Sequence, residues 1–394
     1  MANPVIAPVI VKNGKRLTSI DMLRGLVIVI MALDHVRDML GAPSVRPMEW
    51  ADADASLFFT RWITHLCAPT FVLLAGTSAF LYGASGRTNG DISRFLLTRG
   101  IWLVFVELTL VGFGWNFNLG SSYAPVLQVI WVLGVSMITL AGLIWLPRSL
   151  IAFIAIAMIA GHNLLDGIQP ASEQASIVWR LLHVRGLLTI GGTPLVYVIY
   201  PLIPWIGVMA LGYVIGPYFV GSRHRRPRNL VLTGLAMTVT FVLLRYWNIY
   251  GDANLWQVQG STEATIVDFL NATKYPPSLL FLLMTLGPAI MLLGLFERRA
   301  GALGDALVTI GRVPFFFYVA HLYVIHLIAL VLGLFQGIPI SQTAVVFVFY
   351  PQDFGVSLPL VYGFWICVVL AFYPACRWFA GVKARRRDWW LSYL

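Results

Sequence analysis

The chain has 394 residues, of which 59% are hydrophobic and only 11% carry a charge. Soluble domains are typically about 45–50% apolar and about 25% charged. So few charges cannot cover a water-soluble body of this length, whereas a bilayer requires apolar spans of about 20 residues. The composition therefore excludes an ordinary soluble protein and indicates a membrane protein. Cys67, Cys367 and Cys376 all lie in apolar stretches, a pattern that gives no support to a redox or zinc role.

Ten apolar segments can serve as membrane spans. They are continuous runs, such as residues 230–244, and lack the alternating pattern of a membrane β-barrel. We therefore expect an all-α polytopic membrane protein with about ten transmembrane helices in one bundle. No internal period divides the chain, so residues 1–394 are expected to form one domain. The expected spans are residues 18–40, 61–83, 93–114, 123–146, 150–165, 194–220, 229–250, 276–297, 310–334 and 356–380.

Basic residues occur in alternate connections between these spans, and this alternation predicts the orientation. Lys and Arg near span ends concentrate on the cytoplasmic side of a membrane. The basic connections carry Lys12, Lys15, Arg16, Arg87, Arg94, Arg99, Arg148, Arg223, Arg225, Arg226, Arg228, Arg298, Arg299, Lys383, Arg385, Arg386 and Arg387. The other connections hold most of the loop acids, which are Asp38, Glu49, Asp52, Asp54, Asp166, Glu173, Asp252, Glu263 and Asp268. We expect both termini to be cytoplasmic in an inner-membrane protein, and the net charge of +10 requires no nucleic acid.

Residues 172–190 differ from the spans because bases interrupt the apolar run. Arg180, His183 and Arg185 are interspersed with apolar residues that share one face. This pattern favours a short interfacial helix rather than another span.

The first span has ionisable residues near both of its ends. Such groups cost roughly a few kcal/mol at membrane depth, so each is a candidate for function. Asp21 and Arg24 are three residues apart and can pair on one helical face, either to fix the helix end or to clamp an anion. Asp34 and His35 are adjacent, so their side chains diverge, and at least one is expected to point into a polar cavity.

His65 lies one turn into the second span, at a depth similar to that of His35. Pro69 opens the backbone hydrogen bonding nearby, and the small residues 75–79 allow close packing with a neighbouring helix. His65 can therefore be a helix contact or part of the same cavity as His35.

Two later segments add further candidates. Lys274 and Tyr275 precede two prolines at the mouth of a span, where they can contact a substrate or simply anchor the span at the membrane interface. His321 and His326 are about 140° apart around a helix and do not form a tight metal pair. One of them is expected to face the cavity of His35, and the other to be a helix contact.

Glu107 is a weaker candidate, which can line the cavity wall or pair with a base such as Arg245. The sequence has no GxSxG elbow, Walker loop or GxGxxG after a strand, so hydrolase, NTPase and dinucleotide-binding functions have no support. We expect no bound metal.

Six segments carry a resemblance to a known family. They are RLTSIDMLRGLVIVIMALDHVRD at 16–38, FFTRWITHLCAPTFVLLAGTSAFL at 58–81, YPLIPWIGVMALG at 200–212, RYWNIYGD at 245–252, TKYPPSLLFLLMTLGPA at 273–289 and GRVPFFFYVAHLYVIHLIA at 311–329. Over roughly 16–335 the chain resembles the bacterial branch of the heparan-α-glucosaminide N-acetyltransferase catalytic family, within the transmembrane acyltransferase superfamily. The resemblance implies an enzyme that moves an acetyl group from cytosolic acetyl-CoA to an amino sugar or glycan across the membrane.

The resemblance also implies a histidine mechanism, with one departure. The family is expected to use an outward-facing histidine after the first span, but residues 40–59 contain none. We therefore expect the base to be His35, with Asp34 as its electrostatic support and His65 as the second candidate. Imidazole is suited to this task because its unperturbed pKa is near neutrality.

The remaining roles follow from the two sides of the membrane. The phosphates of CoA are expected to meet Arg24, Arg99 and Arg312 at the inner face. The acceptor is expected to meet the substrate-binding candidates, which are Lys274, Tyr275, His321 and His326. The lipid bilayer is the other expected partner, and the oligomeric state stays open.

A transporter is the competing hypothesis, because buried His and Asp with proline-broken helices also occur in proton-coupled permeases. A partner protein for export of a small molecule or glycan is a further alternative. Consumption of the acetyl-CoA thioester separates these classes from an acyltransferase.

Overall fold

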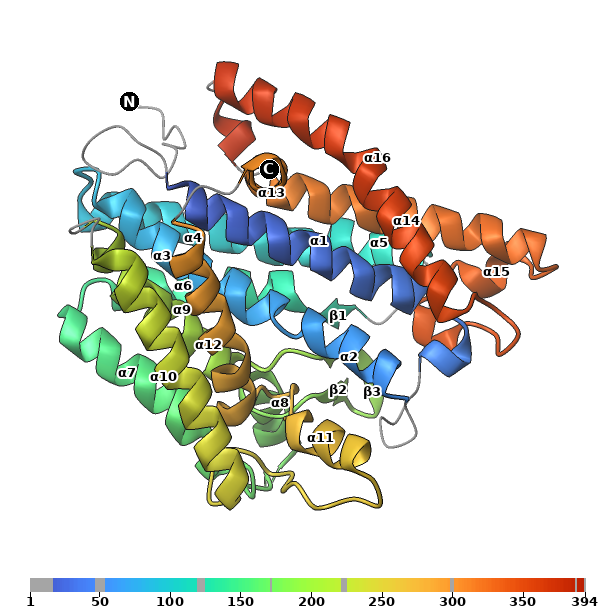
Figure 1. Ribbon diagram of the computed structural model, residues 1–394, viewed down its shortest axis with the longest axis horizontal. Helices are drawn as coiled ribbons and strands as arrows, with labels where there is room; N and C mark the ends of the chain where they lie inside the picture. The colour runs from blue at the N-terminus through green and yellow to red at the C-terminus, as the bar shows by residue number, and fades with distance from the viewer. Residues whose placement is uncertain are drawn as a thin grey trace.

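A computed structural model describes residues 17–46, 54–118, 125–170, 172–220, 225–297, 301–386 and 388–392. Helices account for most of these residues (Figure 1), which confirms the all-α expectation. The longer helices are α1 (Thr18–Leu40), α2 (Ala55–Thr64), α3 (Cys67–Gly83), α4 (Asn89–Val106), α6 (Val129–Leu143), α7 (Arg148–Gly161), α8 (Glu173–Leu182), α9 (Leu202–Ile215), α10 (Arg226–Trp247), α12 (Leu279–Leu295), α13 (Gly301–Gly311), α14 (Pro314–Phe335) and α16 (Leu358–Arg385). The shorter elements are η1 (Pro43–Val45), the π-helix η2 (Glu107–Val111), α5 (Gly112–Asn116), η3 (His162–Leu165), η4 (Gly216–Phe219), α11 (Thr262–Leu270), α15 (Ile340–Thr343), η5 (Phe347–Phe349), η6 (Trp389–Ser392), β1 (Val126–Leu127), β2 (Gly186–Ile190) and β3 (Thr193–Val198).

Helix α1 is the inner helix of the bundle. It packs against α3, α13, α14 and α16, and Figure 1 shows α14 and α16 alongside it. Because neighbours cover so much of its surface, even Asp21, His35 and Arg37 are buried inside the protein. Its ionisable side chains therefore face other helices rather than lipid.

Glycine allows the closest helix contacts. A Cβ atom on Gly76 of α3 would lie 1.9 Å from the carbonyl oxygen of Met209, and one on Gly212 of α9 would lie 2.1 Å from that of Leu73. No other residue fits at either position without moving a backbone. The predicted close packing of the small-residue stretch in the second span is confirmed.

Each of the ten expected spans coincides with at least one helix. Among the described residues, seven helical segments are long and apolar enough to cross a membrane; these are Ala55–Gly83, Asn89–Asn116, Arg148–Leu165, Leu202–Phe219, Arg226–Trp247, Pro314–Phe335 and Leu358–Arg385. Helices α6 and α12 are apolar but shorter, and α1 carries several charges in its 23 residues. The protein is thus polytopic, while the count of ten spans stays a prediction.

A small sheet corrects two expected boundaries. Strands β1, β3 and β2 lie side by side in that order, with β2 and β3 antiparallel and β1 parallel to β3. The expected interfacial helix at 172–190 is therefore helical only at α8 and ends in β2. The expected span at 194–220 likewise begins with β3, and its helix α9 starts at Leu202. The sheet lies at the same end of the bundle as α8 and α11 (Figure 1).

Some residues used to predict the orientation lie outside the described ranges. These are Lys12, Lys15, Arg16, Glu49, Asp52, Arg223, Arg298, Arg299 and Arg387.

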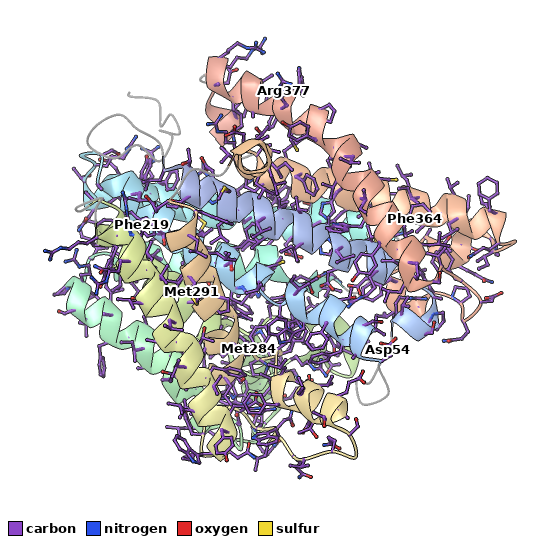
Figure 2. All side chains as sticks on the ribbon, viewed as in Figure 1. Asp54, Phe219, Met284, Met291, Phe364 and Arg377 are labelled. Atoms are coloured by element: carbon purple, nitrogen blue, oxygen red, sulfur yellow. The ribbon has the colours of Figure 1, made fainter. Side chains whose placement is uncertain are left out.

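The ends of α1 identify the two ends of the bundle, the Thr18 end and the Leu40 end. Figure 2 marks the side chains of Phe364 and Arg377 on α16 and of Asp54, which caps the start of α2.

Candidate active site

Two histidines that are far apart in the sequence meet between α1 and α14. His35 Nδ1 lies 2.8 Å from His321 Nε2, and the two rings are nearly parallel, with an interplanar angle of 9°. The second nitrogen of His321, Nδ1, lies 2.7 Å from the carbonyl oxygen of Phe317. His321 is fully buried and His35 is 9% exposed. The structure thus brings the expected base into contact with one of the later histidines.

An ion-pair network occupies the same turn of α1. Arg37 Nη2 lies 2.8 Å from Asp34 Oδ1 and 2.6 Å from Asp38 Oδ1. All three side chains are less than 20% exposed, so one guanidinium balances part of the charge of two largely buried carboxylates. Asp34 therefore binds Arg37 and acts on His35 through space, without a hydrogen bond to it among the contacts of the described residues.

Aromatic side chains hold the ring of His35 from its sides. Trp115 lies edge-on, with its ring centroid 5.0 Å from that of His35, and Tyr318 lies edge-on at 5.9 Å. Trp115 comes from α5 and Tyr318 from α14. Rotation of the imidazole is therefore restricted on both sides.

His65 lies at the break between α2 and α3. The ring is 6% exposed, and neither nitrogen has a hydrogen-bond partner within the described part of the chain. Its closest aromatic neighbour is Phe281 of α12, with ring centroids 5.3 Å apart. Near it, Trp62 Nε1 donates to the sulfur of Met284, which is labelled in Figure 2. Because buried polar groups are normally hydrogen-bonded, His65 is suited to accept a hydrogen bond from, or donate one to, a substrate or an ordered water.

A rigid loop presents Lys274 and Tyr275 to this cluster. The Lys274 ammonium lies 5.2 Å from the Tyr275 ring centroid. Lys274 is near enough for its charge to act on Asp34, His35 and His65. Lys274 thus lies within electrostatic range of both histidines that were predicted as candidates for the base.

Asp252 holds this loop in place, and the sequence reasoning missed it. Its Oδ1 accepts from Thr273 Oγ1 at 2.6 Å and from Asn254 N at 2.9 Å. Its Oδ2 accepts from Thr273 N at 2.8 Å and from Ser278 Oγ at 2.7 Å. One carboxylate thereby fixes both sides of the Lys274–Tyr275 pair. The sequence signals were an acid after the 229–250 span and its place at the end of the RYWNIYGD segment at 245–252.

His326 is not brought into the cluster by direct contact. Its Nδ1 lies 3.0 Å from the carbonyl oxygen of Gly114, and its Nε2 lies 3.0 Å from that of Thr343. The ring stacks on Phe117, with centroids 4.4 Å apart. Both nitrogens thus face backbone carbonyl oxygens rather than the cluster, as in the helix contact predicted for one of the two later histidines.

The Thr18 end of α1 carries a second ion pair. Arg24 Nη1 lies 3.6 Å from Asp21 Oδ1, which confirms the predicted pairing. Arg24 also donates to Ser78 Oγ of α3. The break between α13 and α14 packs here, because a Cβ atom on Gly311 would lie 1.8 Å from the carbonyl oxygen of Asp21. Arg312, the next residue, is exposed at this end.

Arg99 belongs to a different part of the bundle. It lies on α4, where its guanidinium sits 4.4 Å from the ring centroid of Phe95 on the same helix. No described contact joins it to Arg24 or Arg312.

The proposed pairing of Glu107 with Arg245 is wrong. Glu107 Oε2 accepts a hydrogen bond of 2.7 Å from the backbone nitrogen of Trp131, so the carboxyl caps the start of α6. Arg245 instead donates to the carbonyl oxygens of Asn254, Asp268, Phe269 and Asn271. Each side chain thus binds backbone groups at a helix end, while Glu107 Oε1 has no hydrogen-bond partner among the described residues.

The fold and this cluster together describe a polytopic membrane protein with a buried histidine site. A model of the family described as "Heparan-alpha-glucosaminide N-acetyltransferase, catalytic" matches residues 16–247, which is more than half of the chain. The chain belongs to this family, which confirms the resemblance found in the sequence. The match includes Asp34, His35 and His65, whereas Lys274 and His321 lie beyond it. No curated protein matches the chain.

Proposed function

We propose that this chain is an integral-membrane enzyme that transfers an acetyl group from cytosolic acetyl-CoA to an amino sugar or glycan on the other side of the membrane. Family membership supports acetyl transfer. The observation that carries the proposal is the position of His35, an imidazole held on three sides in a buried polar cluster. No described residue bonds to its Nε2. The proposal takes residues 1–394 as one domain.

The chemistry requires a base and a path for one proton. The acceptor nitrogen or oxygen attacks the thioester carbon and gives its proton to His35. The new bond to the acetyl carbon forms, the carbon–sulfur bond breaks, and the CoA thiolate takes the proton from His35. The charge of Asp34 favours the transient imidazolium, while Lys274 and Tyr275 contact the acceptor and His65 is the alternative base.

The basic residues of the Thr18 end fit the acyl donor. Arg24 lies inside the bundle between α1 and α3, and the exposed Arg312 follows the break that packs against Asp21. Guanidinium groups at this end can bind phosphates of CoA, with Arg99 as a more distant contact. The pantetheine arm then extends along the bundle towards the Leu40 end.

This arrangement requires the Thr18 end of the bundle to lie on the cytoplasmic side of the inner membrane. Both termini are then cytoplasmic, and the loop at Asp252 is external. A reporter fused after Arg387 is expected to behave as cytoplasmic, and one inserted near Asp252 as external. An external C-terminal reporter would contradict the orientation.

The decisive experiment measures thioester consumption. Purified protein in liposomes is given acetyl-CoA and glucosamine, and free thiol and acetylated product are measured together. We expect both products to appear in equal amounts. A proton-coupled transporter or an export partner would leave acetyl-CoA intact, and that result would refute the proposal.

A further inference from the structure

We infer that His321 is a positioning residue which fixes His35 in the tautomer that carries its proton on Nδ1, so that Nε2 is the basic nitrogen. This inference rests on the proposed function, since it assigns a task to a residue beside the proposed base. It replaces direct substrate contact as the role of His321.

The two contacts of His321 determine which group donates at each hydrogen bond between His35, His321 and the Phe317 carbonyl. A carbonyl oxygen can only accept, so the 2.7 Å contact with Phe317 requires the proton of His321 to be on Nδ1. A neutral His321 then has a lone pair on Nε2. The 2.8 Å contact is a hydrogen bond only if His35 Nδ1 donates to it. The Phe317 carbonyl thus sets the tautomer of His321, which in turn sets that of His35.

Burial favours this neutral arrangement. His321 is 0% exposed and has no acidic side chain among its described hydrogen-bond partners. A charged imidazole in that position would be costly. Both of its nitrogens are occupied, so His321 has no nitrogen left for the acceptor.

The nearby carboxylate cannot perform the same task in this geometry. Asp34 is next to His35 in the sequence, but its Oδ1 lies 2.8 Å from Arg37 Nη2, and no described hydrogen bond joins Asp34 to His35. A histidine base is usually oriented by the group that accepts from its other nitrogen, and a carboxylate often takes that place. Here the accepting group is Nε2 of His321 on α14, a residue 286 positions further along the sequence.

The pair also affects the reaction itself. When His35 Nε2 takes the acceptor proton, the ring becomes cationic and its Nδ1–H becomes a stronger donor. His321 Nε2 accepts that stronger bond without moving. The proton on Nε2 then goes to the CoA thiolate, while the proton on Nδ1 stays in place. His321 therefore changes the rate of proton transfer and leaves donor binding unaffected.

Histidine tautomers can be observed directly. The full chain is labelled with ¹⁵N-histidine, placed in lipid bilayers and studied by solid-state NMR, and the His35 signals are assigned by their loss in His35→Asn. We expect a protonated Nδ1 and an unprotonated Nε2 for His35, with Nδ1 coupled to a nitrogen of His321. A protonated Nε2 on neutral His35 would overturn the inference.

Two substitutions provide the functional test. His321→Leu removes the accepting nitrogen, whereas His321→Gln keeps an acceptor near the Nε2 position. We expect His321→Leu to lower kcat by roughly 10–100-fold, with the KM for acetyl-CoA unchanged and a mixture of His35 tautomers. His321→Gln is expected to recover part of kcat and the single tautomer. Leu327→Ala, on the exposed side of the same helix, is the control and should retain wild-type kcat.

The outcomes distinguish this inference from the proposed function. Full kcat together with an unchanged tautomer in His321→Leu would refute the positioning role while acetyl transfer by the wild type stands. If His321→Leu fails to fold, the wild-type tautomer and the His321→Gln variant still decide the question. If wild-type protein consumes no acetyl-CoA, the proposed function fails, whatever the tautomer of His35.

Discussion

Both ends of α1 carry an acid and an arginine three residues apart, yet their surroundings differ. At the Thr18 end, Asp21 pairs with Arg24, and Arg24 also donates to α3. At the Leu40 end, Arg37 pairs with two carboxylates. The first arrangement joins two helices, whereas the second lies near His65, whose nitrogens have no hydrogen-bond partner among the described residues. The same local spacing therefore joins two helices at one end and lies beside a buried histidine cluster at the other.

The largest expected effect comes from removing the base at the Leu40 end. His35→Ala should lower turnover by at least roughly 10²–10⁴-fold, because proton removal from the acceptor is lost. Acetyl-CoA consumption and donor binding are measured on the same purified sample, and binding should persist. His65→Ala is the parallel variant. If it loses turnover while His35→Ala does not, the two roles are exchanged, and full activity in both would rule out a histidine base.

Arg37→Gln should have the largest effect on stability. It leaves the largely buried Asp34 and Asp38 without their shared cation, and breaking a fully buried ion pair typically costs about 3–5 kcal/mol, which is the upper value here. Thermal unfolding in detergent should show a clear fall in Tm. Adding Asp34→Asn and Asp38→Asn should restore part of the loss, because the unpaired charges are then removed. A triple variant as unstable as Arg37→Gln would contradict this explanation.

At the Thr18 end, the expected effect is on donor binding. Arg24→Gln and Arg312→Gln should each raise the Kd for acetyl-CoA by roughly tenfold, the equivalent of one lost charge-assisted contact. The fold should persist, as checked by the unfolding temperature. Arg94→Gln, an exposed arginine on α4, is the control for a change in net charge. Unchanged binding in both variants would refute the donor placement.

The sequence predicted the helices and the buried ionisable residues because both leave local signals. Apolar runs of span length identify helices, and a charge inside such a run is conspicuous. The Asp34–Arg37 pair also has the i,i+3 spacing and could have been predicted in the same way as Asp21–Arg24. The contact between His35 and His321 could not, because no local period links residues on different helices.

The small sheet was missed for a different reason. Residues 186–198 are mostly apolar and lie next to α9, so 186–190 were included in the expected interfacial helix and 194–198 in the expected span. Gly191 and Gly192 separate β2 from β3, and both have positive φ angles, +56° and +78°. Two glycines between apolar runs are a hairpin signal. That local pattern was the better guide, since a helix cannot continue through such a turn.

The smallest expected effect concerns the loop that carries Lys274. Asp252→Ala removes the acceptor of four hydrogen bonds, including those from Thr273 and Ser278 on the two sides of Lys274. The loop should then hold Lys274 less well, so the KM for the acceptor should rise by roughly tenfold or less while the Kd for acetyl-CoA stays unchanged. Asp252→Asn, which keeps one acceptor oxygen, should give an intermediate KM. The KM for the acceptor and the Kd for acetyl-CoA should separate in this way because the loop that Asp252 holds lies at the Leu40 end, away from the proposed donor site. An equal change in donor and acceptor binding would mean that the loop supports the whole bundle instead.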